Sequence, residues 1–430
     1  MPESYGGKSP RRLAAVAAIF VILAILAPVA LGGTPAPGDA QPKYRDVRTA
    51  LEAIYLVKSE FYKPVSVSKL ISAYFARGTV SGMLESLGDP YTRYMSPKDF
   101  QALRDDSAGV FGGIGILVGI RNKNITIITP IENTPGMRAG LMPGDHIVEI
   151  DGVSTEGMAL DRAVSMMRGE PGTRVVLVIE RGPQNQRFTV DIIRDIINSP
   201  STRGYMLDKS TGIGYIELRT FSQKAGQEME AEIQRLRTLG MKGLILDLRY
   251  NGGGLVSQAV EVASKFIPPG PVMHVQGRDQ KKKTLETVGK RVVDFPVVVL
   301  VNEYTASASE ILAGALQDNR VATVVGTPTF GKGLVQTLYP LSDGSGLAVT
   351  TQIYLTAGER AITPETPITP DHIVEMPDPE DLPEVKNETP QEPVTAEDLL
   401  RLDPERDLQL RRAIEILSRE IEATESRKAA

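Results

Sequence analysis

The sequence predicts a multidomain α/β protein, and three observations lead to this fold class. The chain has 430 residues, which exceeds the usual size of one domain. From residue 197 to residue 376, apolar strand-like runs alternate with amphipathic helical stretches, as in an α/β core. Before this core, residues 43–106 have helical periodicity, whereas residues 107–196 combine short strands with one helix. We therefore expect an amino-terminal helical segment, a small second domain and an α/β core.

The composition excludes several classes of function. Hydrophobic residues make up 41% of the chain and charged residues 23%, as is usual for globular proteins. The net charge of −5 does not favour a nucleic-acid partner, because such partners usually require a clustered basic surface. The absence of cysteine excludes disulfides, thiolate metal sites and a cysteine nucleophile. The 3 histidines, His146, His274 and His372, are too few and too dispersed for a metal site, so we expect no metal and no cofactor.

Residues 1–42 are predicted to direct export. Lys8, Arg11 and Arg12 precede an uncharged apolar run at residues 13–31, and a linker rich in Gly, Pro and Ala follows. The run exceeds the roughly 7–15 residues of a signal-peptide core and is close to a spanning helix, so we favour a retained membrane anchor over a cleaved signal peptide. Positive charges hold the amino end in the cytoplasm, so either alternative makes the protein extracytoplasmic. We expect it on the periplasmic side of an inner membrane or at the cell surface.

Residues 43–106 are predicted to form helices that are interrupted by a turn. Apolar residues recur at helical spacing, and the sequence GDPYTRYMS at residues 88–96 breaks the pattern. A further helix is expected at residues 97–104, because Ser96 is a favourable N-cap and Pro97 suits the first helical position. We expect this segment to serve packing and assembly rather than chemistry.

Residues 107–196 are predicted to form the small domain. The sequence FGGIGILV at residues 111–118 places a glycine turn ahead of a strand. A PGD turn, a helix at residues 159–168 and strands at residues 175–180 and 188–193 follow. Arg168 ends the predicted helix, and two roles are open for it: a contact with the α/β core, or a cation that stabilises the helix C-terminus.

The α/β core contains a glycine run between a strand and a helix. RYNGGG follows the buried strand predicted at residues 243–248, and a helix is expected at residues 255–266. A phosphate loop would need the motif GxxxxGK[ST], which is absent because glycine follows Lys332. The other chemistry that needs bare backbone N–H groups is an oxyanion hole, which we prefer. Further core elements are expected at residues 213–218, 224–239, 272–276, 297–301, 321–325, 335–338 and 348–354.

A serine and a lysine are predicted to meet at one edge of the core sheet. Ser307 follows the apolar strand of residues 297–301 and precedes a helix expected at residues 310–317, so its hydroxyl should be exposed at a helix N-terminus. Lys332 lies between two glycines after the next strand, so a helix and a strand return it to the same edge. A serine hydroxyl beside an amine is a nucleophile with its base. Ser309 is the alternative nucleophile.

Several motifs make the chain similar to a known family. TASASE followed by GKGLVQ resembles the serine–lysine pattern of the carboxyl-terminal processing (tail-specific) proteases, and RYNGGGL resembles the glycine turn of that family. DPYTRYM is typical of the family's amino-terminal segment, and residues 107–196 resemble a PDZ domain. The resemblance covers residues 43–376 and implies a crotonase-like catalytic core at residues 197–376. It also implies a serine endopeptidase that recognises protein carboxyl termini through its PDZ domain and cuts near them.

The resemblance assigns catalytic roles to individual residues. It selects Ser307 over Ser309 as the nucleophile and makes Lys332 the base, held in place by Gln336. An amine accepts a proton only when it is neutral, so burial must bring the pKa of Lys332 well below the ordinary value of ~10.4. A histidine-based triad is the competing mechanism, and no histidine has a neighbourhood that resembles a catalytic one.

Backbone N–H groups are expected to bind the oxyanion and the carboxylate of the substrate. For the oxyanion we nominate Ala308 and Gly253, and the neighbouring Gly252 and Gly254 remain open. A PDZ domain adds an extended carboxyl terminus to a sheet edge and holds the carboxylate with the free N–H groups of a glycine turn. The residues to which we assign this role are Gly112, Gly113, Ile114 and Gly115.

Residues 377–430 are expected to form a Pro-rich acidic tail and a carboxyl-terminal helix. The tail, mainly residues 378–393, is predicted to be irregular. The helix at residues 396–423 has apolar residues available for packing, either on the core or on a second subunit of a homo-oligomer.

Two other functions are compatible with such an architecture. One is a binding or scaffold protein with an inert core, and the other is an acyl-thioester enzyme, because the family's core resembles that of the crotonases. The intact set of Ser307, Lys332 and Gln336 argues against both.

Overall fold

The computed structural model describes residues 47–121, 124–131, 133–182, 184–376 and 407–429. The apolar run at residues 13–31 and the Pro-rich stretch at residues 378–393 lie outside the described residues, so their predictions remain predictions. Of the helices that the structure describes, none has both the length and the apolar composition needed to cross a membrane.

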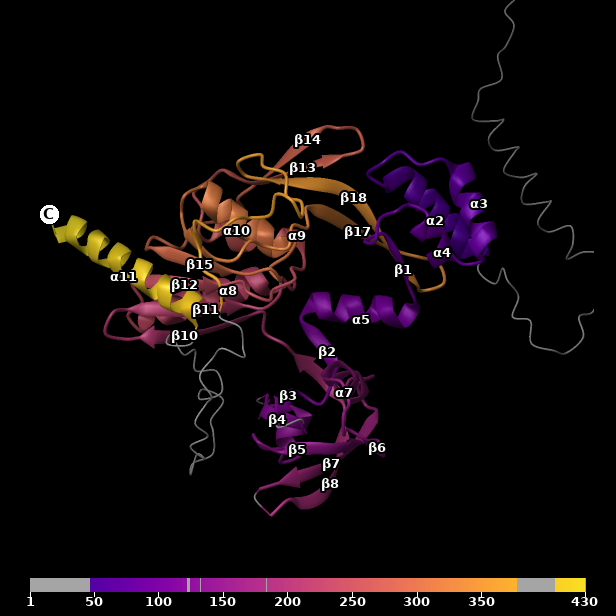
Figure 1. Ribbon diagram of the computed structural model, residues 1–430, viewed down its shortest axis with the longest axis horizontal. Helices are drawn as coiled ribbons and strands as arrows, with labels where there is room; N and C mark the ends of the chain where they lie inside the picture. The colour runs from indigo at the N-terminus through magenta and orange to yellow at the C-terminus, as the bar shows by residue number, and fades with distance from the viewer. Residues whose placement is uncertain (1–46, 122–123, 132, 183, 377–406, 430) are drawn as a thin grey trace, which may run out of the picture. The chain divides into compact units, whose positions relative to one another are not determined.

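The α/β core is built on a six-stranded sheet with the order β10-β11-β12-β15-β16-β19 (Figure 1). Its strands are β10 (Thr202–Asp208), β11 (Ile213–Leu218), β12 (Gly243–Asp247), β15 (Val297–Val301), β16 (Thr323–Gly326) and β19 (His372–Ile373). The pairs from β11 to β19 are parallel, and β10 adds an antiparallel edge. β12 and β15 are buried along their whole length, as expected for strands that are covered on both faces.

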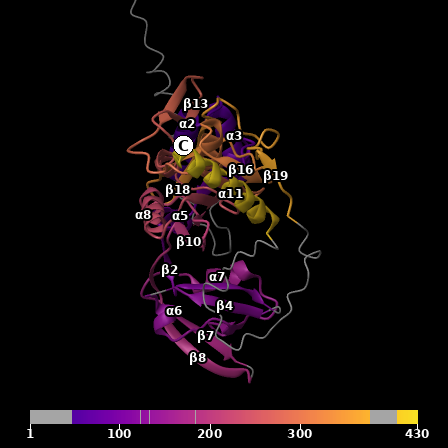
Figure 2. The ribbon, with the colours of Figure 1, turned by 90° about the vertical axis from the view of Figure 1, so that its left-hand side faces the viewer.

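Helices cover both faces of this sheet. They are α8 (Ala225–Thr238), α9 (Val256–Ser264), α10 (Ala308–Asp318) and α11 (Leu408–Ala429). Successive residues of a strand point to opposite faces, so Leu244 and Leu246 of β12 join the hydrophobic core shared with α8, α9 and α10. Ile245, between them, joins the core formed with α11, which crosses the other face (Figure 2).

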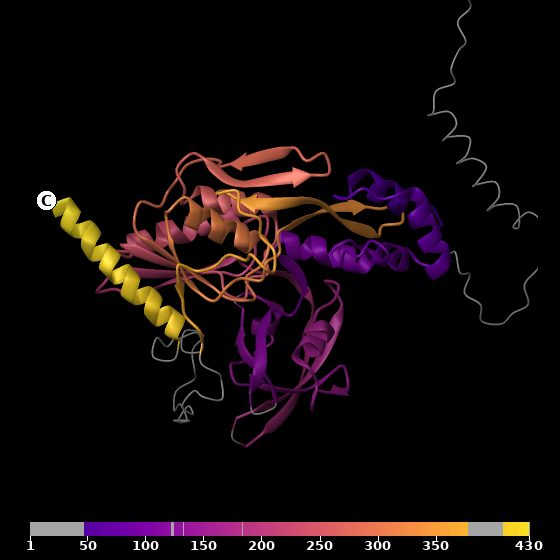
Figure 3. The same ribbon diagram turned by 45° about the horizontal axis from the view of Figure 1, so that its top comes forward.

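The strand that follows the loop of Lys332 belongs to a second sheet. It is antiparallel, with strands β1 (Arg93–Met95), β18 (Gly346–Thr356), β13 (Pro271–Gly277), β14 (Lys282–Glu286) and β17 (Leu334–Pro340). The helices α2 (Val47–Glu60), α3 (Val67–Arg77) and α4 (Val80–Glu85) pack against the far end of β17 and β18 (Figure 3). Leu341, Leu347 and Val349 complete their apolar core. α5 (Pro97–Ala108) follows, capped by Ser96 as predicted.

The small domain has a hydrophobic core of its own. Its elements are β2 (Val110–Gly113), β3 (Ile116–Arg121), β4 (Asn124–Pro130), α6 (Pro135–Arg138), β5 (His146–Ile150), β6 (Val153–Ser154), α7 (Leu160–Met167), β7 (Arg174–Arg181), β8 (Gln186–Ile193) and β9 (Asp195–Asn198). The main sheet has the order β3-β4-β5-β7-β8, and β2 pairs with β9. β3 ends this order, so among the described strands one of its edges has no partner.

Most predicted elements of the core occur within a few residues of their expected bounds. The strand expected at residues 297–301 is β15, and the helix expected at residues 310–317 lies inside α10. The carboxyl-terminal helix is described from Leu408 and continues to Ala429, beyond the predicted end. It docks on the core, which was one of the two alternatives. The strands β1, β10 and β19 were not anticipated, because each is short or lies at a sheet edge.

A largely buried polar network fastens α11 to the sheet. Asp407 caps the helix, because its Oδ1 accepts a hydrogen bond from Leu410 N at 2.9 Å. Its Oδ2 lies 2.8 Å from Arg249 Nη1, and Arg249 also pairs with Asp247 at 2.7 Å. The hydroxyl of Tyr215 donates to Asp247 at 2.6 Å. The buried guanidinium of Arg249 is therefore partly neutralised by the carboxylate of Asp407, at the start of α11.

Replacing Asp407 should weaken the docking of α11 on the core, to an extent that depends on the new residue. Asp407→Ala removes the helix cap and one of the two carboxylates beside Arg249, so the free energy of opening α11 should fall by about 2–4 kcal/mol. Asp407→Asn retains a capping oxygen and should have a smaller effect. Hydrogen–deuterium exchange of the α11 amides measures both changes. Equal exchange in the parent and both variants would contradict this role of the network.

Candidate active site

Ser307 occupies a strained turn between β15 and α10. Its backbone has φ 57° and ψ −116°, a region that residues other than glycine rarely adopt. Such a conformation persists only where the surrounding bonds enforce it. The Ala306 N–H donates to the Asn251 carbonyl at 3.1 Å, and the Tyr354 hydroxyl donates to the Ser307 carbonyl at 3.0 Å. Burial raises the pKa of Tyr354 well above its ordinary value, so the phenol stays protonated and remains a donor.

Ser309 has a different environment from Ser307. It is fully buried, and its Oγ donates to the Asn251 carbonyl at 2.9 Å. A hydroxyl whose proton is engaged and which lies away from solvent is poorly placed to attack a substrate. Ser307 remains partly exposed. The structure therefore favours Ser307 over Ser309 as the nucleophile.

The carboxylate of Glu310 joins the serine turn to the lysine loop. Glu310 is fully buried on the first turn of α10. Its Oε2 accepts hydrogen bonds from the backbone N–H groups of Ser307 and Lys332, both at 2.8 Å. Its Oε1 accepts from Gly331 N at 2.7 Å and from Thr329 Oγ1 at 2.6 Å. One side chain thus fixes the backbones of the two predicted catalytic residues relative to each other.

The glycine turn after β12 lies against the serine turn. A Cβ added to Gly253 would come within 3.0 Å of Ala308 N and of Ser307 Cβ, so a side chain at this position would collide with the nucleophile turn. In this structure the Gly253 N–H donates to Asn251 Oδ1 at 2.9 Å. For the N–H groups of Ala308 and Gly252, both within the described residues, no hydrogen bond is recorded. The glycine turn therefore lies against Ser307 and Ala308, and the predicted oxyanion role of the Ala308 and Gly253 N–H groups remains a prediction.

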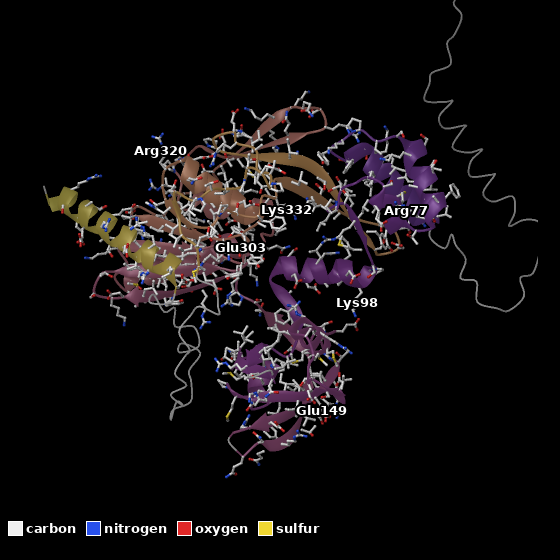
Figure 4. The ribbon with its side chains drawn as sticks, in the orientation of Figure 1. Arg77, Lys98, Glu149, Glu303, Arg320 and Lys332 are labelled. Carbon is white, nitrogen blue, oxygen red and sulfur yellow. The ribbon has the colours of Figure 1, made fainter. Side chains whose placement is uncertain are left out.

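Lys332 is partly buried on the loop before β17 (Figure 4). Its Nζ lies 4.6 Å from the centre of the Tyr91 ring, in a cation–π contact. Burial lowers the pKa of the Lys332 amine, and the nearby Arg93 guanidinium lowers it further. The carboxylates of Glu310 and Asp89 oppose this shift. The direction of the net shift is the one that a lysine base requires.

Glu310 holds the backbones of Ser307 and Lys332 near each other, but no recorded hydrogen bond of the described residues joins their side chains to each other or to Gln336. Among the described residues, the structure records no hydrogen bond between Lys332 and Ser307. The Gln336 carboxamide donates to the Leu334 carbonyl at 3.3 Å rather than to Lys332. The predicted roles of Lys332 as the base and Gln336 as its support remain predictions.

The histidines occupy structural positions. Both ring nitrogens of His274 have partners, Thr284 Oγ1 at 2.9 Å and the Ala357 carbonyl at 3.2 Å. His146 lies on β5 of the small domain, with Nδ1 2.9 Å from Thr126 Oγ1, and His372 lies on β19. The described residues contain no group of three or more His, Asp or Glu side chains that could hold a metal ion.

The small domain presents a strand edge beside a glycine turn. Gly112 and Gly113 lie in β2, whereas Ile114 and Gly115 connect β2 to β3. The carbonyls of Ile114 and Gly115 accept bonds from Gly136 N at 2.6 Å and Ile131 N at 2.9 Å, which fixes the turn. For the N–H groups of Ile114 and Gly115, the described residues provide no recorded acceptor. α7 packs beside β3, so the edge strand and the helix frame the predicted peptide site.

Among the described residues, no hydrogen bond or ion pair joins Arg168 to the α/β core. Arg168 is the C-cap residue of α7 through its backbone N–H, which donates to the Val164 carbonyl at 2.9 Å, so the predicted role of its charge at the helix C-terminus remains a prediction. Its guanidinium also lies 4.6 Å from the Phe111 ring centre and 3.6 Å from Asp106 of α5.

Sequence reasoning missed two residues that contact the catalytic positions. Glu310 carries a recognisable signal, because Ser307 and Glu310 have the spacing of a capping box at a helix start. Tyr91 carries no local signal for its place beside Lys332. The expectation that its segment, GDPYTRYMS, serves packing remains a prediction, although the contact of Tyr91 with Lys332 and the effect of Arg93 on the pKa of that lysine were not anticipated.

Comparison with known sequences identifies relatives over most of the chain. The model of peptidase family S41 matches residues 212–374, and a PDZ-domain model matches residues 126–181. The carboxy-terminal-processing protease of Bartonella bacilliformis is 37% identical over 348 residues, 80% of this chain and 78% of the relative. The carboxyl-terminal-processing protease of Synechocystis sp. is 39% identical over 304 residues, which are 69% of this chain and 70% of the relative.

Solved structures agree with this relationship. A photosystem II D1 C-terminal processing protease is similar with a TM-score of 0.51 at 30% identity, covering 79% of this chain and 96% of that protein. A putative S41 protease from Bacteroides fragilis has the same fold, with a TM-score of 0.52 at 16% identity and coverage of 80% and 92%. This chain has a PDZ domain, and its serine turn lies on the α/β core that these proteins share. The chain belongs to the carboxyl-terminal-processing serine proteases of peptidase family S41.

Proposed function

We propose that this protease is an extracytoplasmic endopeptidase that recognises the carboxyl termini of proteins through its PDZ domain and cleaves near them with a Ser307–Lys332 dyad. The observation that carries the proposal is the pair of 2.8 Å hydrogen bonds from Ser307 N and Lys332 N to the same Glu310 carboxylate. A nucleophile and a base must be held in register to act together, and a buried carboxylate with several donors is a rigid anchor. Membership in a protease family favours peptide hydrolysis over an inert scaffold or acyl-thioester chemistry.

The proposed reaction uses Ser307 as the attacking group. Neutral Lys332 takes the serine proton while Oγ bonds to the substrate carbonyl carbon, and the resulting ammonium then protonates the leaving amine. Water attacks the acyl-enzyme in the same way and releases the second product. The lysine amine lies against the Tyr91 ring and has no recorded hydrogen bond to Ser307 among the described residues, so we propose that it rotates toward Oγ when substrate is bound. Its flexible side chain allows this rotation while Glu310 keeps the Lys332 backbone in place, and Gln336 then supports the amine near the serine.

The oxyanion of the intermediate is proposed to bind at the junction of two turns. The Ala308 N–H lies at the N-terminus of α10, where backbone donors favour negative charge. The second donor comes from the glycine turn, either Gly253 after release from Asn251 or the neighbouring Gly252. Substrate carboxyl termini are proposed to extend the small-domain sheet along β3, with the carboxylate at the turn of Ile114 and Gly115.

The extracytoplasmic location is supported by the sequence. Basic residues precede an apolar run at residues 13–31, which is typical of exported proteins. We also propose that this run attaches the protein to a membrane and that the protein forms a homo-oligomer.

Ser307→Ala should abolish cleavage of a protein with an apolar carboxyl terminus and leave its binding intact, because recognition belongs to a separate domain. Ser309→Ala is the matched control, two residues away. It removes one buried hydrogen bond to Asn251, so it should reduce stability slightly and retain activity. Cleavage is followed by mass spectrometry of the products. A Ser307→Ala protein that cuts at the parent rate would assign the nucleophile elsewhere.

The pH dependence should identify the base. Because the lysine must be neutral, kcat/KM should rise with pH, with a midpoint below the ordinary ~10.4 since the pKa of Lys332 is lowered. Lys332→Arg keeps the charge and cannot lose its proton in this range, so it should be as inactive as Lys332→Ala. Replacing His146, His274 and His372 by Gln should leave the profile nearly unchanged in folded protein. Loss of the rising limb in that variant would favour a histidine base.

Deleting residues 109–195 should remove the preference for free carboxyl termini. The chain enters and leaves this domain at adjacent points, because Ser199 N donates to the Gly109 carbonyl at 2.9 Å, so a short linker can close the gap. Cleavage of a substrate is compared with cleavage of its carboxyl-amidated twin. Unchanged discrimination after the deletion would place tail recognition outside the PDZ domain.

A further inference from the structure

We propose that Tyr250 and Tyr304 form an aromatic platform that binds an apolar substrate side chain beside the scissile bond. This inference rests on the proposed endopeptidase function and specifies which substrates it prefers. The two rings stack with centroids 5.4 Å apart and an interplanar angle of 17°. They are nevertheless 74% and 58% exposed. A stacked pair that faces solvent offers apolar area to a ligand.

The platform lies on the two turns that build the catalytic site. Tyr250 immediately precedes Asn251 and the glycine turn, and Tyr304 lies three residues before Ser307. These turns follow β12 and β15, which are neighbouring parallel strands, so both open at the same sheet edge. Gly253 approaches Ser307 Cβ from one of these turns. The stacked rings therefore lie on the two turns that meet at Ser307, and a substrate whose carbonyl reaches Ser307 is proposed to pass beside them.

A buried side chain holds the two turns in register. The Oδ1 of Asn302 accepts hydrogen bonds from Tyr250 N at 3.0 Å and from Tyr304 N at 3.2 Å, and Asn302 is 4% exposed. The Thr305 hydroxyl adds a bond to the Leu248 carbonyl at 2.9 Å. The backbones that carry the rings are thus fixed before substrate arrives. Such preorganisation reduces the entropy lost on binding.

The conformation of Tyr250 is unfavourable for its residue type. Its φ of 61° lies in the left-handed region, where a bulky side chain is strained and Gly or Asn fits better. The ring is exposed, so burial in the core does not offset this strain. A strained and exposed aromatic residue beside a catalytic serine suggests a function in binding.

A third exposed aromatic residue lies on the loop that carries Lys332. Phe330 is 50% exposed on the loop after β16, two residues before Lys332. Its N–H donates to the Thr305 carbonyl at 3.0 Å, so its backbone adjoins the turn of Tyr304. Glu303 is the charged neighbour of Tyr304 in this turn, and its Oε2 accepts from Thr327 Oγ1 at 3.1 Å (Figure 4). Three exposed aromatic residues thus lie on the turns beside Ser307 and Lys332, and we expect their apolar area to favour an apolar side chain of the substrate.

The test compares substrates that differ in one residue. Peptides with Phe, Leu, Lys or Ala on either side of the cleaved bond are offered to the parent and to Tyr250→Asn combined with Tyr304→Ala. Asparagine tolerates the left-handed backbone, so the turn should be retained. We expect kcat/KM for the Phe and Leu peptides to fall about tenfold, and kcat/KM for the Ala peptide to change little. Tyr55→Ala on α2, an equally exposed tyrosine, is the surface control.

Labelling by a small fluorophosphonate separates this inference from the proposed function. If Ser307 of the parent neither reacts with the probe nor cuts any peptide, the proposed endopeptidase function fails. If the double variant labels and cuts at the parent rates with an unchanged Phe-to-Ala ratio, the platform is overturned. The platform is also overturned if the double variant loses labelling rate and kcat/KM for every peptide by the same factor. In that case the two rings only maintain the conformation of the turn. A parent preference for Lys over Phe would also overturn the apolar assignment.

Discussion

The buried carboxylate of Glu310 is the interaction on which the catalytic geometry depends. It accepts four hydrogen bonds, from Ser307, Thr329, Gly331 and Lys332, and so joins the start of α10 to the loop before β17. A buried carboxylate without partners would be costly, and three of these four partners are backbone N–H groups that need an acceptor. The helix start and the lysine loop therefore stabilise each other, and neither can shift without leaving polar groups unsatisfied.

This anchor allows the serine turn to keep an unfavourable backbone. Asn251 binds the turn from the glycine side through Ala306 and Ser309, and Tyr354 binds the Ser307 carbonyl from β18. Ser307, the proposed nucleophile, is thus held by the parallel sheet, the antiparallel sheet and α10 together. The same arrangement explains the glycine at position 253, because any Cβ there would press on the Ser307–Ala308 peptide.

Recognition and catalysis are assigned to parts of the chain with separate hydrophobic cores. The PDZ domain packs around its own apolar residues and offers the edge of β3, while the core offers the turns of Ser307, Gly253 and Lys332. The aromatic pair proposed as a substrate platform belongs to the second set. Mutations should therefore be able to change the specificity for the carboxyl terminus of a substrate without changing the specificity for the residue at the cleaved bond, and the reverse.

The sequence by itself determined the order of domains, the strand before Ser307, the helix after it and the glycine turn. These depend on hydrophobic periodicity and helix capping, which act between residues close in the chain. Only the tertiary structure decided that Ser309 is buried with its hydroxyl on the Asn251 carbonyl and that Tyr91 contacts Lys332. The stacking of Tyr250 on Tyr304 is of the same kind. Such contacts join residues distant in the chain, and they arise because packed elements bring particular side chains together, which no local pattern encodes.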